Sequence, residues 1–375
     1  MDMAGKRFAR RVKDIDISGI RKMFESAGPG AINLGLGQPD FDTPSHIKEA
    51  AICAIREGFT GYTPGPGILE LRTALCEKFK NENGLEFSPS EIIVTSGASE
   101  ALEIALACLV EPGDEVLIPD PGFVSYKTLT TIMGAKAVPV PLEEDLTLSP
   151  QKLTEYIGPA TRAFIVNSPA NPTGAVQSPE DMKAFSQIAD DHNITMICDE
   201  VYEHFIYEGR HVSPALYSDN VITVNAVSKT YAMTGWRLGY VAARDEYIQQ
   251  MLKIHQYVQA CANSIAQKAA VAAVGGSLEP VITMREEFRK RRNVLVEGLN
   301  SIGLDCALPG GAFYAFPYAG DDYPDIVSEL ISSGVIVVPG SAFGSNGSGH
   351  IRISYAASMD DIKQALDIME KTIRC

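Results

Sequence analysis

The chain has 375 residues, a formal net charge of −15, and 45% hydrophobic and 21% charged residues. This length exceeds what one hydrophobic core usually serves, so we expect roughly two domains. A chain this acidic repels phosphate backbones and anionic lipids, which argues against a nucleic-acid or membrane-surface role.

The N-terminal charges are not followed by an apolar block, so we expect no secretory signal. No apolar stretch approaches the roughly 20 residues of a transmembrane helix. The seven cysteines are scattered and contain no CxxC motif. Their odd number and wide spacing predict reduced, buried thiols, a cytoplasmic location and no metal site.

Short apolar, β-branched runs alternate with helical segments through the middle of the chain. This alternation predicts an α/β protein with a mostly parallel seven-stranded sheet covered by helices. Ser178–Asp191 and Asp245–Tyr257 have the apolar stripe of amphipathic helices, and Ser178 before Pro179 fits a helix cap. The expected strands are Glu91–Thr95, Glu115–Pro119, Ala137–Val140, Arg162–Asn167, Thr195–Cys198, Val221–Asn225 and Leu238–Ala242.

The pattern changes near residue 280 and predicts a smaller α+β domain at the C-terminal end. The first 45 residues lack the strand–helix alternation and are expected to pack with it. We therefore assign 46–280 to a large domain, and 1–45 together with 281–375 to a small domain. The expected elements of the tail are a charged helix Glu286–Ile302, strands around Ala312–Phe316, Val335–Val338 and His350–Ser354, and a closing helix Met359–Ile373.

Polar groups directly follow four of the expected strands: Ser96–Ser99, Asn167–Gly174, Asp199–Tyr202 and Ala226–Lys229. Ligands of open α/β sheets bind beyond the carboxyl ends of the strands. We therefore expect these four segments to meet in one crevice.

Each of these groups also has an ordinary structural explanation. Small residues such as Gly97–Ser99 can leave helix N–H groups free for a phosphate, but a plain N-cap turn explains them more simply. A buried Asp199 would need a cationic partner, unless it caps a turn. A desolvated Lys229 would have a lowered pKa and attack carbonyl groups, although most lysines are solvated. Tyr202 could simply pack in the core, and Asn171 could begin a turn.

One competing motif is present. The run from Gly97 to Ala101 resembles a degenerate nucleophile elbow between a strand and a helix, with Ser99 as the nucleophile of a serine hydrolase. That reaction needs a histidine base, and no histidine has a distinctive sequence context. Complete dinucleotide-binding, P-loop and zinc-protease motifs are absent.

Three blocks resemble the class I/II aminotransferases, which depend on pyridoxal 5'-phosphate (PLP): Asn171–Gly174 (NPTG), Asp199–Tyr202 (DEVY) and Ser228–Tyr240 (SKTYAMTGWRLGY). The similarity, greatest to prokaryotic aspartate and aromatic aminotransferases, extends from Asn33 to Tyr355. It implies an aspartate aminotransferase-like fold and a homodimer.

The resemblance also implies a role for each matching residue. Lys229 would bind PLP covalently and, once freed, move the proton of the substrate's α-carbon. Asp199 would keep the ring nitrogen of PLP protonated, and Tyr202 and Asn171 would hydrogen-bond the 3′ oxygen. Phe123 would stack on the ring. The phosphate would be bound by Arg237, Gly97, Ala98, Ser99, Ser228 and Tyr62 of the second subunit, and the substrate by Arg352, Gly37 and Asn171.

Three positions depart from the family pattern. Ala226 stands where many relatives have a phosphate-binding serine, so we expect Ser228 to carry more of that role, and Ala170 stands where asparagine is common. Phe123 stands where relatives have tryptophan or tyrosine, and it should retain the stacking. None of these changes removes a catalytic group.

The resemblance implies ping-pong transfer of an amino group from an L-amino acid to a 2-oxo acid such as 2-oxoglutarate. We expect aspartate as the first substrate, with an aromatic or broad-range aminotransferase as the alternative and a PLP-dependent lyase as another reaction class. A dicarboxylic substrate needs a second cation, for which Arg21, Lys22 or a residue of the second subunit are candidates. Solvated charges on a helix are the simpler explanation of Arg21 and Lys22. Leu36, Ile17 and Ile20 would instead suit an apolar side chain.

Overall fold

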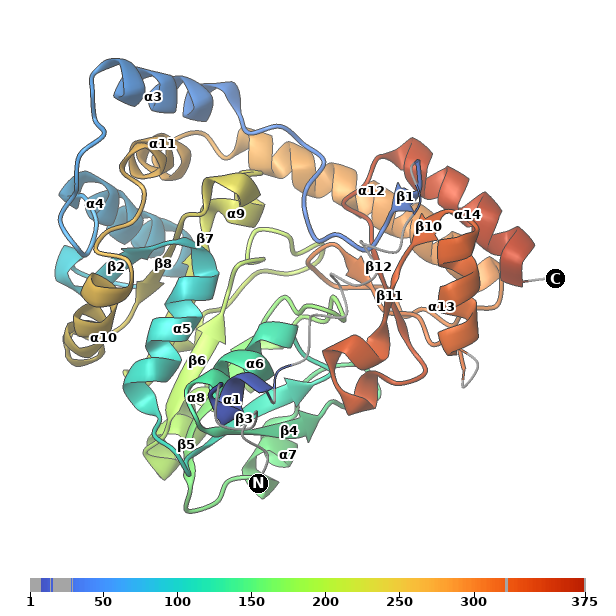
Figure 1. Ribbon diagram of the computed structural model, residues 1–375, viewed down its shortest axis with the longest axis horizontal. Helices are drawn as coiled ribbons and strands as arrows, with labels where there is room; N and C mark the ends of the chain where they lie inside the picture. Colours follow the sequence, from blue (N-terminus) through green and yellow to red (C-terminus); the bar gives the residue numbers. More distant parts are fainter. Residues whose placement is uncertain (1–7, 14, 16–27, 29, 321–322, 374–375) are drawn as a thin grey trace.

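This computed structural model describes residues 8–13, 15, 28, 30–320 and 323–373. The strands of its largest sheet are β2 (Ile92–Thr95), β3 (Glu115–Asp120), β4 (Lys136–Pro141), β5 (Thr161–Asn167), β6 (Thr195–Asp199), β7 (Val221–Ala226) and β8 (Gly239–Ala242). Their order is β2-β8-β7-β6-β5-β3-β4, and all are parallel except β8 (Figure 1). The predicted mostly parallel sheet of seven strands is confirmed.

Helices cover both faces of this sheet because its strands are buried on both sides. The helices are α3 (Ser45–Arg56), α4 (Leu69–Lys78), α5 (Gly97–Leu109), α6 (Val124–Ile132), α7 (Pro150–Glu155), α8 (Pro179–His192), α9 (Val227–Thr230), α10 (Asp245–Val258) and α11 (Ser264–Val274). Ile93 and Ile165 pack with α5, α6 and α10 on one face. On the other face, Val166 packs with α7 and α8, and Val94 packs with α3, α4 and α11.

Helix α8 shows why the local prediction succeeded. Ser178 Oγ accepts a hydrogen bond from the backbone N–H of Asp181 at 3.0 Å, and Pro179 occupies the first turn. This arrangement satisfies one otherwise unpaired N–H group and uses proline where it needs no donor.

The C-terminal part forms a separate α+β arrangement at one end of the large sheet (Figure 1). It contains β9 (Tyr314–Ala315), β10 (Val335–Ile336), β11 (Val338–Pro339), β12 (Ile351–Ser354), α12 (Glu279–Ser301), α13 (Tyr323–Ser332) and α14 (Met359–Ile373). Strands β11, β12 and β9 form an antiparallel sheet. The expected strand Val335–Val338 is instead two strands, β10 and β11, in different sheets.

Helix α12 begins at Glu279, earlier than the expected start at Glu286. The predicted start of the helix was wrong because it was placed at the charged segment, which is only the middle of the helix. The helix can include Pro280 because this residue lies in the first turn, where proline is tolerated.

Only part of the N-terminal segment follows the expected packing. Strand β1 (Ile32–Asn33) pairs in parallel with β10, so these residues join the C-terminal part. Helix α1 (Arg10–Lys13) instead contacts α6 beside the large sheet (Figure 1). Ile17, Ile20, Arg21 and Lys22 lie outside the described residues, and the domain boundaries stay a prediction.

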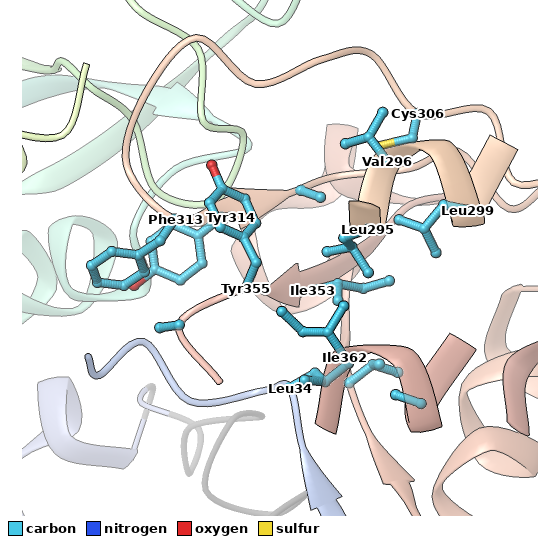
Figure 2. Packing of buried hydrophobic residues seen from close by; sticks show 14 of the residues in the cluster. Leu34, Leu295, Val296, Leu299, Cys306, Phe313, Tyr314, Ile353, Tyr355 and Ile362 are labelled. Carbon is cyan, nitrogen blue, oxygen red and sulfur yellow. The ribbon is translucent and has the colours of Figure 1, made fainter. Parts of the chain in front are cut away.

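A large apolar cluster forms the core of the C-terminal part. Leu34 from the N-terminal segment packs there with residues of α12, α14 and β12, among them Leu295 and Ile353 (Figure 2). Phe313 and Tyr314 lie on one side of this cluster, and the same cluster includes Tyr202 from the segment after β6. The core therefore joins the C-terminal part to the strand ends of the large sheet.

The six described cysteines are free thiols, as expected. Cys198 and Cys306 are buried as predicted, Cys76, Cys108 and Cys261 are half-buried, and Cys53 is exposed, so the prediction of a buried thiol was wrong at Cys53. Cys53 belongs to an apolar run that forms α3, and the helical period turns it away from the buried Ala51 and Ala54. No helix in the described part of the chain combines the length and apolar character that crossing a bilayer requires.

Candidate active site

A cavity of about 240 Å³ lies at the carboxyl ends of the parallel strands, where the C-terminal part packs against the large sheet. All four predicted strand-end segments contribute to it, so the expectation of one shared crevice is confirmed. The lining residues are Leu36, Gly37, Ala98, Ser99, Leu102, Phe123, Tyr126, Asn167, Asn171, Asp199, Val201, Tyr202, Ala226, Ser228, Lys229, Thr234, Arg237, Tyr314 and Arg352.

Asp199 places a carboxylate at the end of β6, where it is only 4% exposed. The Tyr126 hydroxyl donates to Oδ2 at 2.8 Å, and the Val201 N–H donates to Oδ1 at 3.3 Å. No lysine or arginine among the described residues hydrogen-bonds this carboxylate. Burial raises the pKa of Asp199 to about 6, against the lowering effect of the Tyr126 hydrogen bond. Lys229 lowers the pKa of this carboxyl group electrostatically, but no described cation forms an ion pair with it.

Lys229 lies in α9, directly after β7, and its Nζ donates a hydrogen bond to the Gly37 carbonyl oxygen at 2.6 Å. Desolvation lowers the pKa of this amine to about 8, with further lowering by the charges of Arg352 and Arg237. The neighbouring Asp199 acts in the opposite direction. The amine is therefore partly neutral near physiological pH, which a nucleophile or proton acceptor requires.

The tyrosine and the amide expected at the site are both held by residues of the C-terminal part. The Tyr202 and Tyr314 hydroxyl oxygens lie 2.8 Å apart and share a hydrogen bond. Arg352 Nη1 donates to Asn171 Oδ1 at 3.0 Å, and its Nη2 donates to the Gly35 carbonyl oxygen. The guanidinium group is buried, and its Nε has no hydrogen-bond partner among the described residues. It can therefore bind an anionic group in the cavity.

A second place for an anion lies at the start of α5. The first N–H groups of a helix are unpaired and lie at the positive end of its dipole. Gly97 has φ +78°, and a Cβ there would lie 2.7 Å from an Arg237 nitrogen. The Arg237 guanidinium thus lies against the first turn of α5. Ser99 and Ser228 also line the cavity.

Two predicted site residues do not line the cavity. Gly97 lies directly behind it, next to Ala98 and Arg237. Tyr62 is 93% exposed and does not reach this cavity from its own chain.

The serine-hydrolase interpretation finds no support in the geometry. Ser99 lines the cavity, but none of the six histidines does, and all six lie in the described part of the chain. His255, the histidine on the neighbouring α10, shares hydrogen bonds with Glu100 Oε1 and the Gly65 carbonyl oxygen instead. Ser99 therefore lacks the histidine base on which the serine-hydrolase interpretation depends.

Comparison with known proteins shows the family. Residues 29–368 match the family described as "Aminotransferase class I and II". The chain belongs to this family. The aminotransferase is 45% identical to "Probable aspartate aminotransferase" of Methanocaldococcus jannaschii, over 96% of this chain and 98% of the relative. It is 42% identical to "Aromatic-amino-acid aminotransferase 2" of Thermococcus litoralis, over 97% of each chain.

The fold comparison agrees. The solved structure of Thermus thermophilus aspartate aminotransferase with maleate has a TM-score of 0.92 and 37% identity, covering 98% of this chain and all of that chain. The aspartate aminotransferase-like fold implied by the resemblance is confirmed. Class I and II aminotransferases depend on PLP and exchange amino groups between amino acids and 2-oxo acids.

The cavity of this aminotransferase fits the charge pattern of PLP. Its phosphate is anionic, and the first turn of α5 with Arg237 forms an anion site. Its ring nitrogen becomes cationic on protonation, and Asp199 is a buried carboxylate that no described cation contacts in an ion pair. Its aldehyde reacts with neutral amines, and Lys229 has a lowered pKa.

Sequence reasoning missed two residues of the site, Tyr126 and Tyr314. Tyr126 lies in the first turn of α6, close after the predicted Phe123, and its spacing from Phe123 was the only available signal. Tyr314 follows Phe313 in an apolar segment and resembles core packing. Its contact with Tyr202 arises only from the way the C-terminal part folds back onto the large sheet.

Proposed function

We propose that this aminotransferase binds PLP in the cavity at the strand ends and transfers the amino group of an L-amino acid to a 2-oxo acid such as 2-oxoglutarate. The observation that carries the proposal is that Asp199 and Lys229 line one cavity. Asp199 is a buried carboxylate that no described cation contacts in an ion pair, and Lys229 is an amine with a pKa of about 8.

The described side chains suggest how PLP would be held. Arg237 and the first turn of α5 would bind the phosphate, assisted by Ser228. Asp199 would face the ring nitrogen, and Phe123 would stack on the ring. Tyr202 and Asn171, both buried, would hydrogen-bond the 3′ oxygen.

When bound, PLP supplies an aromatic ring that accepts the electrons left after the substrate's α-carbon loses its proton. Lys229 Nζ would take that proton, because its lowered pKa leaves a substantial neutral fraction near pH 8. Asp199 would remain charged once a cation lies beside it, since an opposite charge offsets the effect of burial on its pKa. Arg352, already oriented by Asn171 and Gly35, would bind the substrate's α-carboxylate.

Aspartate is our first candidate for the amino-group donor. Its support comes from the names of the Methanocaldococcus jannaschii relative and the Thermus thermophilus structure. The three cations of the described cavity lining, Lys229, Arg237 and Arg352, all have proposed roles. A second cation for aspartate would thus come from outside this lining, for which Arg21 and Lys22 remain candidates.

An aromatic or broad-range substrate is the second candidate. The Thermococcus litoralis relative is named for aromatic amino acids, and Leu36 and Tyr314 give the cavity an apolar wall. Rates with aspartate, phenylalanine and tyrosine against 2-oxoglutarate distinguish the two substrate classes. A ratio of kcat/KM that favours tyrosine over aspartate would reject our first candidate.

The proposed functional unit is a homodimer. Tyr62 is almost fully exposed on its own chain, which suits a residue that contacts the phosphate in a second copy. Sedimentation analysis should give twice the chain mass of 40.4 kDa. A strictly monomeric, active enzyme would contradict this proposal. The cytoplasmic location expected from the free cysteines stays a prediction.

The visible absorption spectrum tests the proposed reaction. The purified protein with PLP should show a band between roughly 360 and 430 nm that shifts on adding an amino acid and returns with a 2-oxo acid. Transfer of ¹⁵N from the amino acid to 2-oxoglutarate separates an aminotransferase from a PLP-dependent lyase. Loss of the amino group as ammonia, without transfer, would indicate a lyase.

A further inference from the structure

We infer that Tyr314 is a positioning residue of the active site, whose hydroxyl orients the Tyr202 hydroxyl and whose ring supports the Arg352 guanidinium. This inference rests on the proposed function, because it concerns the groups that would bind PLP and the substrate's α-carboxylate. It concerns a residue outside the strand ends of the large sheet.

The backbone holds Tyr314 at the junction of the two parts of the molecule. Strand β9 is antiparallel to β12, with Tyr314 paired to Ser354. The side chain is only 1% exposed, and it lies at one side of the apolar cluster of the C-terminal part (Figure 2). Phe313 packs beside it, with ring centroids 5.0 Å apart. This packing leaves little freedom for the Tyr314 ring to rotate.

The hydroxyl of Tyr314 makes a specific contact in the cavity. It lies 2.8 Å from the Tyr202 hydroxyl, and the two rings meet edge to face with centroids 5.7 Å apart. A hydroxyl that donates its proton to one partner can still accept from another. If Tyr202 donates to the 3′ oxygen of PLP, Tyr314 must donate to Tyr202. The two tyrosines then form a directed chain that strengthens the terminal hydrogen bond.

The ring of Tyr314 has a separate contact with Arg352. The guanidinium carbon lies 4.7 Å from the centroid of the Tyr314 ring and 4.7 Å from that of Phe343. Asn171 and Gly35 accept two of its hydrogen bonds. The two aromatic rings therefore help to fix the position of the Arg352 guanidinium beside the cavity that it lines.

Gly37 shows how closely Tyr314 approaches the site. A Cβ at Gly37 would lie 1.9 Å from the Tyr314 hydroxyl oxygen, so only glycine fits there without displacement. The carbonyl oxygen of the same residue accepts the hydrogen bond from Lys229 Nζ. Tyr314 thus lies against Tyr202, Arg352 and the backbone that holds Lys229. Asp199 also acts electrostatically on Tyr202, and Tyr202 acts in the same way on Tyr126, which donates a hydrogen bond to Asp199.

Three variants of the PLP-bound enzyme test the inference. Tyr314→Phe removes the hydroxyl and keeps the ring, whereas Tyr314→Leu removes both. Tyr207→Phe is the matched control, because Tyr207 is also buried but donates its hydroxyl proton to the Ala312 carbonyl oxygen, away from the cavity lining. The first readout is the midpoint of the pH titration of the PLP absorption band in the resting enzyme. The second is the Kd of 2-methylaspartate, which lacks the α-proton and therefore cannot be deprotonated at the α-carbon or complete amino-group transfer.

Tyr314→Phe should raise the midpoint by at least roughly 0.3 pH unit, because the weakened Tyr202 hydrogen bond stabilises the deprotonated 3′ oxygen less. The Kd of 2-methylaspartate for Tyr314→Phe should stay within about twofold of the wild-type value, since the aromatic ring beside Arg352 remains. Tyr314→Leu should show the same shift and bind the analogue at least roughly threefold more weakly. Tyr207→Phe should change neither quantity.

A double-mutant cycle gives a second measurement. In a Tyr202→Phe background, the further change Tyr314→Phe should leave the midpoint unmoved, because its effect acts through Tyr202. An unchanged midpoint in Tyr314→Phe, or equal shifts in both backgrounds, would overturn the inference while leaving the proposed function intact. A wild-type protein that takes up no PLP would overturn both.

Discussion

Replacing Asp199 with asparagine should stabilise the cofactor-free protein at neutral pH and nearly abolish catalysis. Burial raises the pKa of this carboxyl group from 3.8 to about 6. The folded protein therefore binds the proton more tightly than the unfolded chain. Its free energy of unfolding falls as the pH rises from about 4 to about 6. At about 1.36 kcal/mol per pH unit, the charged carboxylate costs the folded protein about 3 kcal/mol at neutral pH.

The asparagine variant avoids this cost because an amide carries no charge. Its single oxygen keeps only one of the hydrogen bonds from Tyr126 and Val201, which costs about 1 kcal/mol. The net gain near pH 7.5 should therefore be about 2 kcal/mol. The stability difference between variant and wild type should grow by about 1 kcal/mol between about pH 5 and pH 7.5, since about one unit of the pKa shift lies above pH 5.

Urea unfolding of both cofactor-free proteins at these two pH values measures the difference. Asp120→Asn is the control, because Asp120 is equally buried but accepts hydrogen bonds from Ser345 and Asn346 away from the cavity. This control should be destabilised at both pH values. In the PLP-bound enzyme, Asp199→Asn should lower kcat by at least roughly a hundredfold. An Asp199 variant that is no more stable than wild type near pH 7.5, or a pH-independent difference, would refute the reasoning.

Three further variants test individual groups. Lys229→Ala should bind PLP without the covalent link and lower turnover by at least roughly a thousandfold. Stopped-flow spectroscopy follows the binding of PLP, and steady-state rates measure the turnover. Near wild-type activity of this variant would contradict the role of Lys229. In the wild-type cofactor-free protein, the rate of PLP uptake should increase with pH, and the midpoint of the increase should lie near pH 8, because only neutral Lys229 reacts with PLP. A rate that does not depend on pH would count against Lys229 as the reacting amine. Arg352→Gln should raise KM for every amino acid by roughly a hundredfold with a smaller change in kcat; selective loss of dicarboxylic substrates alone would disagree. Tyr126→Phe should raise the pKa of Asp199 further, because the hydrogen bond from the Tyr126 hydroxyl lowers it. The same change should lower kcat roughly three- to tenfold. An unchanged pKa of Asp199 in this variant would argue against the hydrogen bond.

The large sheet could be predicted because its signals are local. Each of the seven strands is a short apolar run, and β6 and β7 are buried along their full length. Their carboxyl ends meet in a parallel sheet, so the segments containing Asp199 and Lys229 were expected to lie together from their positions alone. The cap of α8 was equally visible, because Ser178 and Pro179 act within one helical turn.

The missed features depend on contacts between distant segments. Tyr314 reaches Tyr202 across 112 positions of sequence, and no local pattern reports such a contact. The strand expected at Val335–Val338 divides because Val335 pairs with Ile32 and Val338 with Arg352. The hydrogen bond from Tyr126 to Asp199 likewise requires that β3 and β6 both flank β5 in the sheet.

The central claim is that the amine of Lys229 and the carboxylate of Asp199 form a PLP site. The most direct measurement adds PLP to the purified cofactor-free protein, reduces it with borohydride, and locates the adduct by peptide mass spectrometry. We predict one phosphopyridoxyl group per chain, attached to Lys229. A protein that remains colourless and unmodified, or an adduct confined to other lysines, would contradict the claim.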